Sequence, residues 1–176
     1  MSSFMSQYLR AQIQGGCYFF TVVTYQRRHI FTTEAHVELL RQACRRTMLK
    51  RPFTIDAMVI LPNHLHCIWQ LPSGAADYSS RWRDIKKAVS QHINHSTNTR
   101  NERPVWQRRF WEHTIRDEKD WRQHMDYIHY NPVKHGLATS PAAWPWSSFH
   151  HAVNRGWYDP AWGSSEPQHI ANLLWE

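Results

Sequence analysis

The segment FTIDAMVILPNHLHCIWQL, residues 53–71, holds two apolar runs joined by the pair Pro62-Asn63. Each run has the length of one strand and is rich in β-branched or aromatic residues. Pro-Asn is a turn signal, and a link this short joins antiparallel neighbours. The segment therefore predicts a β-hairpin with strands over residues 53–61 and 64–71.

Upstream of this hairpin the sequence predicts one strand and one helix. CYFFTVVTY, residues 17–25, is aromatic and β-branched, which is typical of a largely buried strand. Thr32 or Thr33 can cap a helix that begins near Glu34, because a threonine hydroxyl accepts a hydrogen bond from the first helical turn. Pro52 ends that helix.

Downstream of the hairpin the sequence predicts a second helix and a fourth strand. Ser79 or Ser80 is the expected helix cap, and apolar residues follow at helical spacing. The polar stretch 94–103 is expected to form a loop, and the fourth strand should lie within residues 104–115.

The last predicted element of the core is a third helix. It should begin after the cap Asp117 and end near Tyr130, since Asn131 precedes Pro132 and a residue before proline avoids the α region. The chain beyond Lys134 is rich in Trp and Pro and is expected to be irregular, with short helices.

The predicted order is strand, helix, strand, strand, helix, strand, helix. Its first six elements match the split βαβ or ferredoxin-like arrangement, an α+β fold in which the strand over 64–71 lies centrally in an antiparallel sheet. A chain of 176 residues fits a single domain, with a core over about residues 15–149 and an extension over about 150–176.

Composition limits the function classes. Lys plus Arg number 21 and Asp plus Glu 14, so the net charge is 21 − 14 = +7, which favours an anionic partner such as nucleic acid, an acidic membrane surface or a phosphorylated ligand. The hydrophobic content of 41% and aromatic content of 14% argue against disorder. Three widely spaced cysteines without a CxxC motif suggest a reducing compartment. We expect a soluble, cytoplasmic protein without membrane contact, because no signal-like or spanning apolar run occurs.

Two groups of residues have the spacing of a metal site. His64 and His66 would point to one face of their strand and could converge on a divalent ion, although two ordinary hydrogen-bonded histidines would look the same. On the third helix, His124, Tyr127 and Asn131 share a face. This face could offer a tyrosine nucleophile and a third ligand, or simply a packed Tyr and a helix-terminal Asn.

Basic residues gather in clusters that alternate with aromatic residues. Phosphates attract the cations and unpaired bases stack on the rings, so the clusters predict a nucleic-acid surface, whereas solvated helix faces are the plainer interpretation. The residues expected to contact DNA are Arg27, Arg28, Arg81, Arg83, Lys86, Lys87, Arg108 and Lys134.

Three motifs together resemble those of the REP-associated tyrosine transposases. These motifs are LPNHLHCIW at residues 61–69, FWEHTIRD at 110–117 and YIHYNPVKHGL at 127–137. The stretch GGCYFFTVVT at 15–24 is similar to the opening strand of the same family, and the likeness extends to about Phe149. The family is related to the single-tyrosine insertion-sequence transposases of the His-hydrophobic-His nuclease superfamily.

The resemblance implies a fold, a site and a substrate. The fold would be ferredoxin-like, and His64 and His66 would bind Mg²⁺ or Mn²⁺. Tyr127 would attack a phosphodiester in single-stranded DNA, become linked to the 5′ phosphate and leave a free 3′-OH. By likeness to related transposases Asn131 would complete the metal site. The substrates would be repetitive extragenic palindromes, which fold as imperfect hairpins.

Two other functions fit the same sequence. The chain could be a catalytically silent protein that binds hairpin DNA, or a metal hydrolase of a small phosphorylated substrate. The long basic surface favours DNA over a small substrate. The C-terminal extension favours a self-contained monomer over a homodimer.

Overall fold

The computed structural model describes residues 12–93 and 104–175. The segment expected to form the polar loop, 94–103, lies outside the described residues, as does the N-terminal stretch 1–11. The described strands are β1 (Cys17–Val23), β2 (Thr54–Leu61), β3 (His64–Gln70) and β4 (Trp111–Thr114). The helices are α1 (Glu34–Lys50), α2 (Tyr78–Ser90), α3 (Glu118–Lys134) and α4 (Phe149–Asn154), with 3-10 turns η1 (Tyr25–Arg27) and η2 (Pro141–Ala143).

The described strands form one antiparallel sheet in the order β2-β3-β1-β4. The predicted hairpin is present, with Leu61 opposite His64 across Pro62-Asn63, and β3 lies centrally as expected. In register, Thr21 of β1 lies between His66 of β3 and Trp111 of β4. Since cross-strand neighbours share a face, these three side chains form a row across the sheet.

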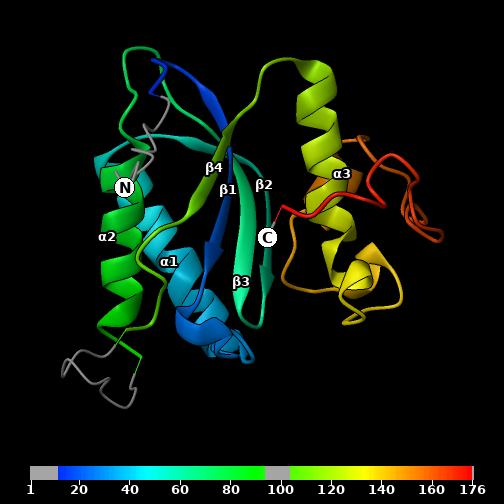
Figure 1. Cartoon of the computed structure of the whole chain (residues 1–176), viewed down its shortest axis with the longest axis horizontal. Helices are drawn as coiled ribbons and strands as arrows, with labels where there is room; N and C mark the ends of the chain where they lie inside the picture. Colours follow the sequence, from blue (N-terminus) through cyan, green and yellow to red (C-terminus); the bar gives the residue numbers. More distant parts are fainter. Residues whose placement is uncertain (1–11, 94–103, 176) are drawn as a thin grey trace, which may run out of the picture.

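Helices cover both faces of the sheet. Figure 1 shows α1 and α2 on one side and α3 with the C-terminal segment on the other. The alternation of β1 follows this division: Tyr18 and Phe20 pack toward α1 and α2, whereas Phe19 packs toward α3. The mixed architecture with an antiparallel sheet confirms the ferredoxin-like α+β prediction.

Three helix caps test the sequence prediction. Thr33 caps α1 by accepting a hydrogen bond from the His36 N–H, and Asp117 caps α3, both as expected. The expectation for α2 is wrong, because Asp77 is the cap and accepts from the Ser80 N–H. Both kinds of residue are good caps, and the aspartate begins the helix two or three residues earlier.

The predicted end of α3 is also wrong. The helix continues through Pro132 to Lys134, and the His135 N–H still donates to the Asn131 carbonyl oxygen. Asn131 and Pro132 are both buried, so tertiary packing outweighs the local preference of a residue before proline. The extra turn carries Lys134 into the same region as Tyr127.

The chain beyond Lys134 is largely irregular and contains the short helices η2 and α4, as predicted. Its aromatic residues nevertheless pack on α3. Tyr158 and Trp162 join Phe149, Met125 and Ile128 in the apolar core between the sheet and α3, which we call the second core cluster. Within the described ranges, no helix has the length and apolar character needed to cross a membrane.

Candidate active site

The two histidines of β3 lie side by side on the α3 face of the sheet. Their ring centroids are 4.9 Å apart, and both side chains are buried. The Nδ1 of His64 is 2.6 Å from Asn63 Oδ1, an acceptor, so this nitrogen carries the proton. The Nδ1 of His66 is 2.8 Å from Thr21 Oγ1, whose single proton already goes to the Trp175 carbonyl oxygen, so Nδ1 of His66 donates as well.

Both Nε2 atoms are therefore left with free lone pairs. Neither has a hydrogen-bond partner among the described residues, and both are buried. A buried polar atom without a partner is costly, and two such lone pairs side by side suit a bound cation. Imidazoles that are held through Nδ1–H and present a bare Nε2 are the form that ligates metal ions.

Asn131 supplies the same kind of orphaned atom from α3. Its side chain is fully buried, and neither Oδ1 nor Nδ2 has a hydrogen-bond partner in the described chain. The side chain therefore does not cap the helix. The donor set of His64, His66 and Asn131 fits a divalent ion, because it combines two imidazole nitrogens with one amide oxygen.

Tyr127 packs against His66, one member of this histidine pair. Its side chain is 1% exposed, and its ring centroid is 5.3 Å from that of His66. The Nζ of Lys134 is 4.8 Å from the centre of the Tyr127 ring. A cation at this position favours the negatively charged phenolate over the neutral phenol.

The C-terminal tail covers the site. The Trp175 N–H donates to the Tyr127 hydroxyl at 3.3 Å, and its carbonyl accepts from Thr21 at 2.6 Å. Its indole stacks on His124 with centroids 3.9 Å apart and planes 8° apart. Lys134 donates to the carbonyl of Leu173. The tail therefore engages the Tyr127 hydroxyl itself and two further groups of the site, the Thr21 hydroxyl and the Lys134 ammonium.

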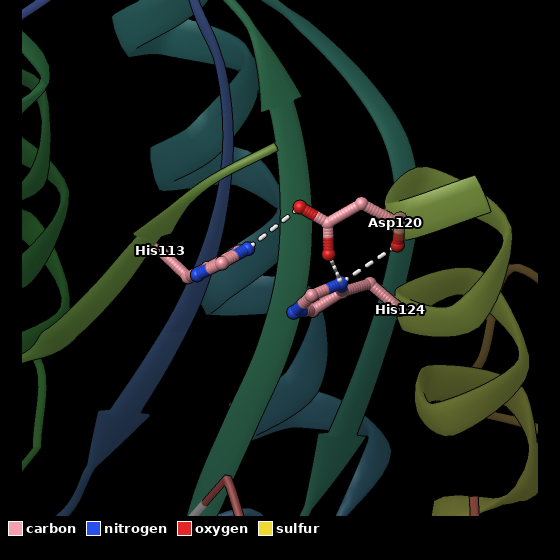
Figure 2. Close-up of side chains that lie close together, drawn as sticks. All are labelled: His113, Asp120 and His124. Atoms are coloured by element: carbon pink, nitrogen blue, oxygen red, sulfur yellow. Dashed lines mark hydrogen bonds and ion pairs between the residues drawn. The ribbon is translucent and has the colours of Figure 1, made fainter. Parts of the chain in front are cut away.

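A second cluster, His113, Asp120 and His124, holds ligand-type atoms within 4.8 Å of one another (Figure 2). This cluster could hold a metal ion, but its carboxylate is already occupied. His113 Nε2 and Arg116 Nε lie 2.8 Å and 3.0 Å from Asp120 Oδ2, and the ion pairs lower the pKa of Asp120 to about 2 against the effect of burial. We assign the cluster to fastening the first turn of α3 to β4.

Burial is the main cause of the shifted histidine pKa values. It lowers the pKa of His64 to about 3, and the charges of His135 and Arg27 add to the effect. Burial also lowers the pKa of His124 to about 4 and of His129 to about 3, and that of His66 lies well below its ordinary value. These four imidazoles are neutral at neutral pH.

The buried histidines should make the folded state sensitive to mild acid. The unfolded chain binds protons near pH 6.5, whereas the folded chain resists them, so stability is full above pH 6.5 and falls toward pH 3. Each such histidine costs about 1.4 kcal/mol at pH 5.5. We expect the melting temperature to drop steeply between pH 7 and pH 5, and His129→Gln to reduce the drop. A flat profile over this range would contradict the assignment.

The basic residues expected to contact DNA separate into different roles. Arg81 is a correction: it is buried, and its guanidinium donates to the backbone carbonyls of Arg51, Asp77 and Pro52, so it holds α2 against the α1–β2 link. Arg28 lies over the Tyr25 ring. Arg27 and Lys87 are exposed, and the Lys134 ammonium lies over the Tyr127 ring.

Three of these basic residues meet in one cleft. Arg83 and Lys86 of α2 line it together with Arg108, which precedes β4, and the cleft has a volume of about 300 Å³. The Nζ of Lys86 also donates to the carbonyl of Gln107, which fastens this chain segment to α2. Sequence spacing placed Arg83 and Lys86 on one face, and the fold adds Arg108.

Two residues of the site, Thr21 and Trp175, carry little or no signal in the sequence. Thr21 lies within an apolar strand, and only the β1–β3 register shows that it orients His66. Trp175 lies 48 residues from Tyr127 in sequence. The alternation of β1 does predict that Thr21 faces α3, and this was the one available signal.

Comparisons with known proteins agree on one family. Residues 13–131 match the family model described as transposase IS200 like. A REP-associated tyrosine transposase of Escherichia coli is 48% identical over 158 residues, which are 90% of this chain and 91% of that protein. A Haemophilus influenzae protein that bears the same family name is 39% identical over 92% of this chain and 95% of its own length. A solved structure of a REP-associated tyrosine transposase bound to a REP hairpin has a TM-score of 0.79 and 43% identity, and the match covers 97% of this chain and 99% of that one.

Proposed function

Because this chain belongs to the REP-associated tyrosine transposases and is therefore a transposase, we propose that it cuts and rejoins single-stranded DNA at REP hairpins through Tyr127. The observation that carries the proposal is the packing of Tyr127 against His66 of the buried histidine pair, with Lys134 beside its ring. The relative solved with a REP hairpin supports the substrate.

The residues of the chain divide the work of one cleavage step. The Tyr127 oxygen attacks the phosphorus and loses its proton to solvent, the P–O3′ bond breaks, and the 3′ oxygen takes up a proton. Lys134 favours the phenolate form of the nucleophile. The phosphotyrosine ester conserves the phosphodiester bond, so the 3′-OH of a strand can reverse the step and rejoin DNA without ATP.

His64, His66 and Asn131 would hold Mg²⁺ or Mn²⁺. When bound, the ion supplies Lewis-acid chemistry at a nonbridging phosphate oxygen. Thr21 and Asn63 accept hydrogen bonds from the Nδ1–H groups of His66 and His64, so the Nε2 lone pair of each histidine is free to bind the ion. These hydrogen bonds fix the two rings and so preorganise the ligands. Imidazole nitrogen suits Mn²⁺ better than Mg²⁺, so we expect Mn²⁺ to support more activity.

A single copy of the chain contains the whole proposed site. Tyr127 of α3 packs on His66 of β3 within one chain, so no second subunit is needed to complete it. We propose that the enzyme acts as a monomer. Light scattering measures the molar mass of the protein at each concentration at which cleavage is assayed. Cleavage in proportion to the concentration of monomer supports the proposal, and cleavage only where dimers form contradicts it.

The proposed function is tested by trapping the covalent product. A labelled single-stranded hairpin with unpaired flanks is incubated with Mn²⁺ and resolved on a denaturing gel. We expect a protein–DNA adduct and a free 3′ product, and no reaction with a blunt duplex, because the strand must bend into the site. Tight hairpin binding without any adduct would identify the silent DNA-binding alternative. Hydrolysis of a small phosphoester without an adduct would identify the metal hydrolase.

Asn131→Ala should weaken metal use without unfolding the protein. Its amide makes no hydrogen bond that the substitution would break. We expect the Mn²⁺ concentration for half-maximal cleavage to rise several-fold while the melting temperature changes little. Unchanged metal dependence would remove Asn131 from the ligand set. His129→Gln, on the same helix and hydrogen-bonded to Ser148, is the control for a change that affects packing alone.

Charge reversal on the exposed face of α2 should reduce the salt dependence of binding. For single strands the log–log slope is about −0.7 per neutralised phosphate. Arg83→Glu and Lys87→Glu remove two exposed cations of α2, so the slope should flatten by about one unit. Arg46→Glu, an exposed arginine on α1, is the matched control. Equal slopes for all three variants would show that this face is only solvated.

A further inference from the structure

The turn η1 follows directly on β1, the strand that lies beside the proposed metal ligands. Its last residue, Arg27, is exposed, and within residues 12–93 and 104–175 the Arg27 side chain makes no hydrogen bond or ion pair. We propose that Arg27 is a further catalytic residue, whose guanidinium donates to a nonbridging oxygen of the phosphate that Tyr127 attacks. The inference rests on the proposed function and adds a residue to its chemistry.

Sheet register places Arg27 beside the proposed metal ligands. Arg27 lines a cavity of about 360 Å³ whose walls include Thr21 and Val23 of β1. Thr21 lies opposite His66 of β3, and Val23 lies opposite His64. Cross-strand partners share a face of the sheet, and adjacent strands lie about 5 Å apart. The cavity that Arg27 lines is therefore one strand away from the histidine pair, on the same face.

The charge of Arg27 reaches both histidines. Burial is the main cause of the low pKa values of His64 and His66, and the Arg27 charge lowers both pKa values further. Arg109 lines the same cavity but is not among the causes of either shift. The guanidinium of Arg27 therefore lies within electrostatic range of the histidine pair, whereas that of Arg109 lies farther away.

The backbone that presents Arg27 is strained and firmly held. Gln26 and Arg27 have φ values of 53° and 51° and are the only non-glycine residues with positive φ in the described chain. The Thr24 N–H and hydroxyl lie 2.9 Å and 2.8 Å from the Asn63 carbonyl oxygen, and the Asn63 side chain accepts from His64 Nδ1. Strained residues persist where the surroundings fix them, often at active sites. The turn that carries Arg27 is thus tied to the turn that orients His64.

A guanidinium at this position suits the proposed reaction. The nonbridging oxygens of the phosphate carry negative charge while the Tyr127 oxygen bonds to phosphorus and the P–O3′ bond breaks. A guanidinium offers N–H donors in a rigid fork and stays protonated, so Arg27 neither gives nor takes a proton in this step. Donors that are already in place at such an oxygen stabilise the transition state. Lys134, in contrast, acts on the nucleophile itself.

Single-turnover cleavage of a labelled hairpin at saturating protein tests the proposal. We expect Arg27→Ala to slow adduct formation on the order of 100-fold, while hairpin affinity, read by fluorescence anisotropy, changes only a few fold and the melting temperature is unchanged. Arg27→Lys keeps the charge without the fork, so its rate should lie between those of Arg27→Ala and the wild type. Arg109→Ala, in the same cavity, should keep the wild-type rate. A wild-type rate for Arg27→Ala, or an equal loss for Arg109→Ala, would overturn the proposal.

Sulfur substitution at the scissile phosphate tests the contact itself. Each phosphorothioate diastereomer replaces one nonbridging oxygen by sulfur, which accepts hydrogen bonds less well. One diastereomer should slow the wild type several-fold and cause no further loss in Arg27→Ala, because the contact is already absent. No effect of sulfur on the wild type, or equal effects in both proteins, would overturn the contact. Absence of any adduct from the wild type would refute the cleavage reaction, whereas an adduct whose rate is independent of Arg27 would refute this inference alone.

Discussion

Tyr127→Phe is expected to abolish cleavage and covalent attachment, while affinity for a hairpin stays within a few fold of the wild type. The substitution removes only the hydroxyl oxygen, and the ring can keep its contacts with His66 and Phe19. The lost hydrogen bond from the Trp175 N–H is long, at 3.3 Å, and its loss should change stability little. No other oxygen of the side chain remains to form the ester.

Tyr130 offers a matched control on the same helix. It lies one turn after Tyr127 but packs in the second core cluster near Trp162, with ring centroids 6.3 Å apart, rather than at the histidine pair. Burial also raises its pKa, which disfavours the phenolate. Tyr130→Phe should therefore keep adduct formation. If the Tyr127→Phe protein still formed adducts and the Tyr130→Phe protein did not, Tyr130 would be the nucleophile and Tyr127 would not.

Deleting residues 173–176 is expected to raise the cleavage rate on the order of ten-fold. In the proposed mechanism DNA would need the groups that the tail holds, because Trp175 engages the Tyr127 hydroxyl and Thr21 while Leu173 engages Lys134. An enzyme whose open form is a minor population loses apparent affinity in proportion to that population. Removing the tail restores the open form, and single-turnover cleavage of a labelled hairpin measures the change.

Two point variants test whether the gain comes from removing the contacts of the tail or from shortening the protein. Trp175→Ala removes the indole that stacks on His124 at 3.9 Å, and it should reproduce most of the gain. Leu174→Ala alters a side chain that is 80% exposed, and it should change nothing. If Trp175→Ala and the deletion both lower the rate, the tail supports the site instead of blocking it.

The sequence predicted much of this site because strand and helix periodicity are local. Residues i and i+2 on a strand share a face whatever the strand packs against, which placed His64 and His66 together. Residues i and i+4 on a helix do the same for Tyr127 and Asn131. The same periodicities, with the short Pro62-Asn63 link, yielded the strand order and the ferredoxin-like fold.

Other predictions failed where local preference competed with burial. Asn131-Pro132 would end an isolated helix, yet both residues are buried and α3 continues for another turn. Arg81 belongs to a basic cluster in sequence, yet the α2 face that carries it packs against the link to β2. Its guanidinium therefore donates hydrogen bonds to backbone carbonyls and is not available to DNA. Neither the length of α3 nor the burial of Arg81 can be predicted from neighbours in the sequence, because both depend on the segments that pack against these residues in the fold.

Local spacing along the chain already predicts which residues share a face, and with them the histidine pair, the tyrosine helix and the family motifs. What those faces contact depends on the assembled fold. Sheet register brought Thr21 to His66, the extra turn of α3 brought Lys134 to Tyr127, and the fold returned Trp175 to the same place. The physical reason is that periodicity fixes direction within one element, whereas contacts between distant segments depend on how all the apolar faces are buried together.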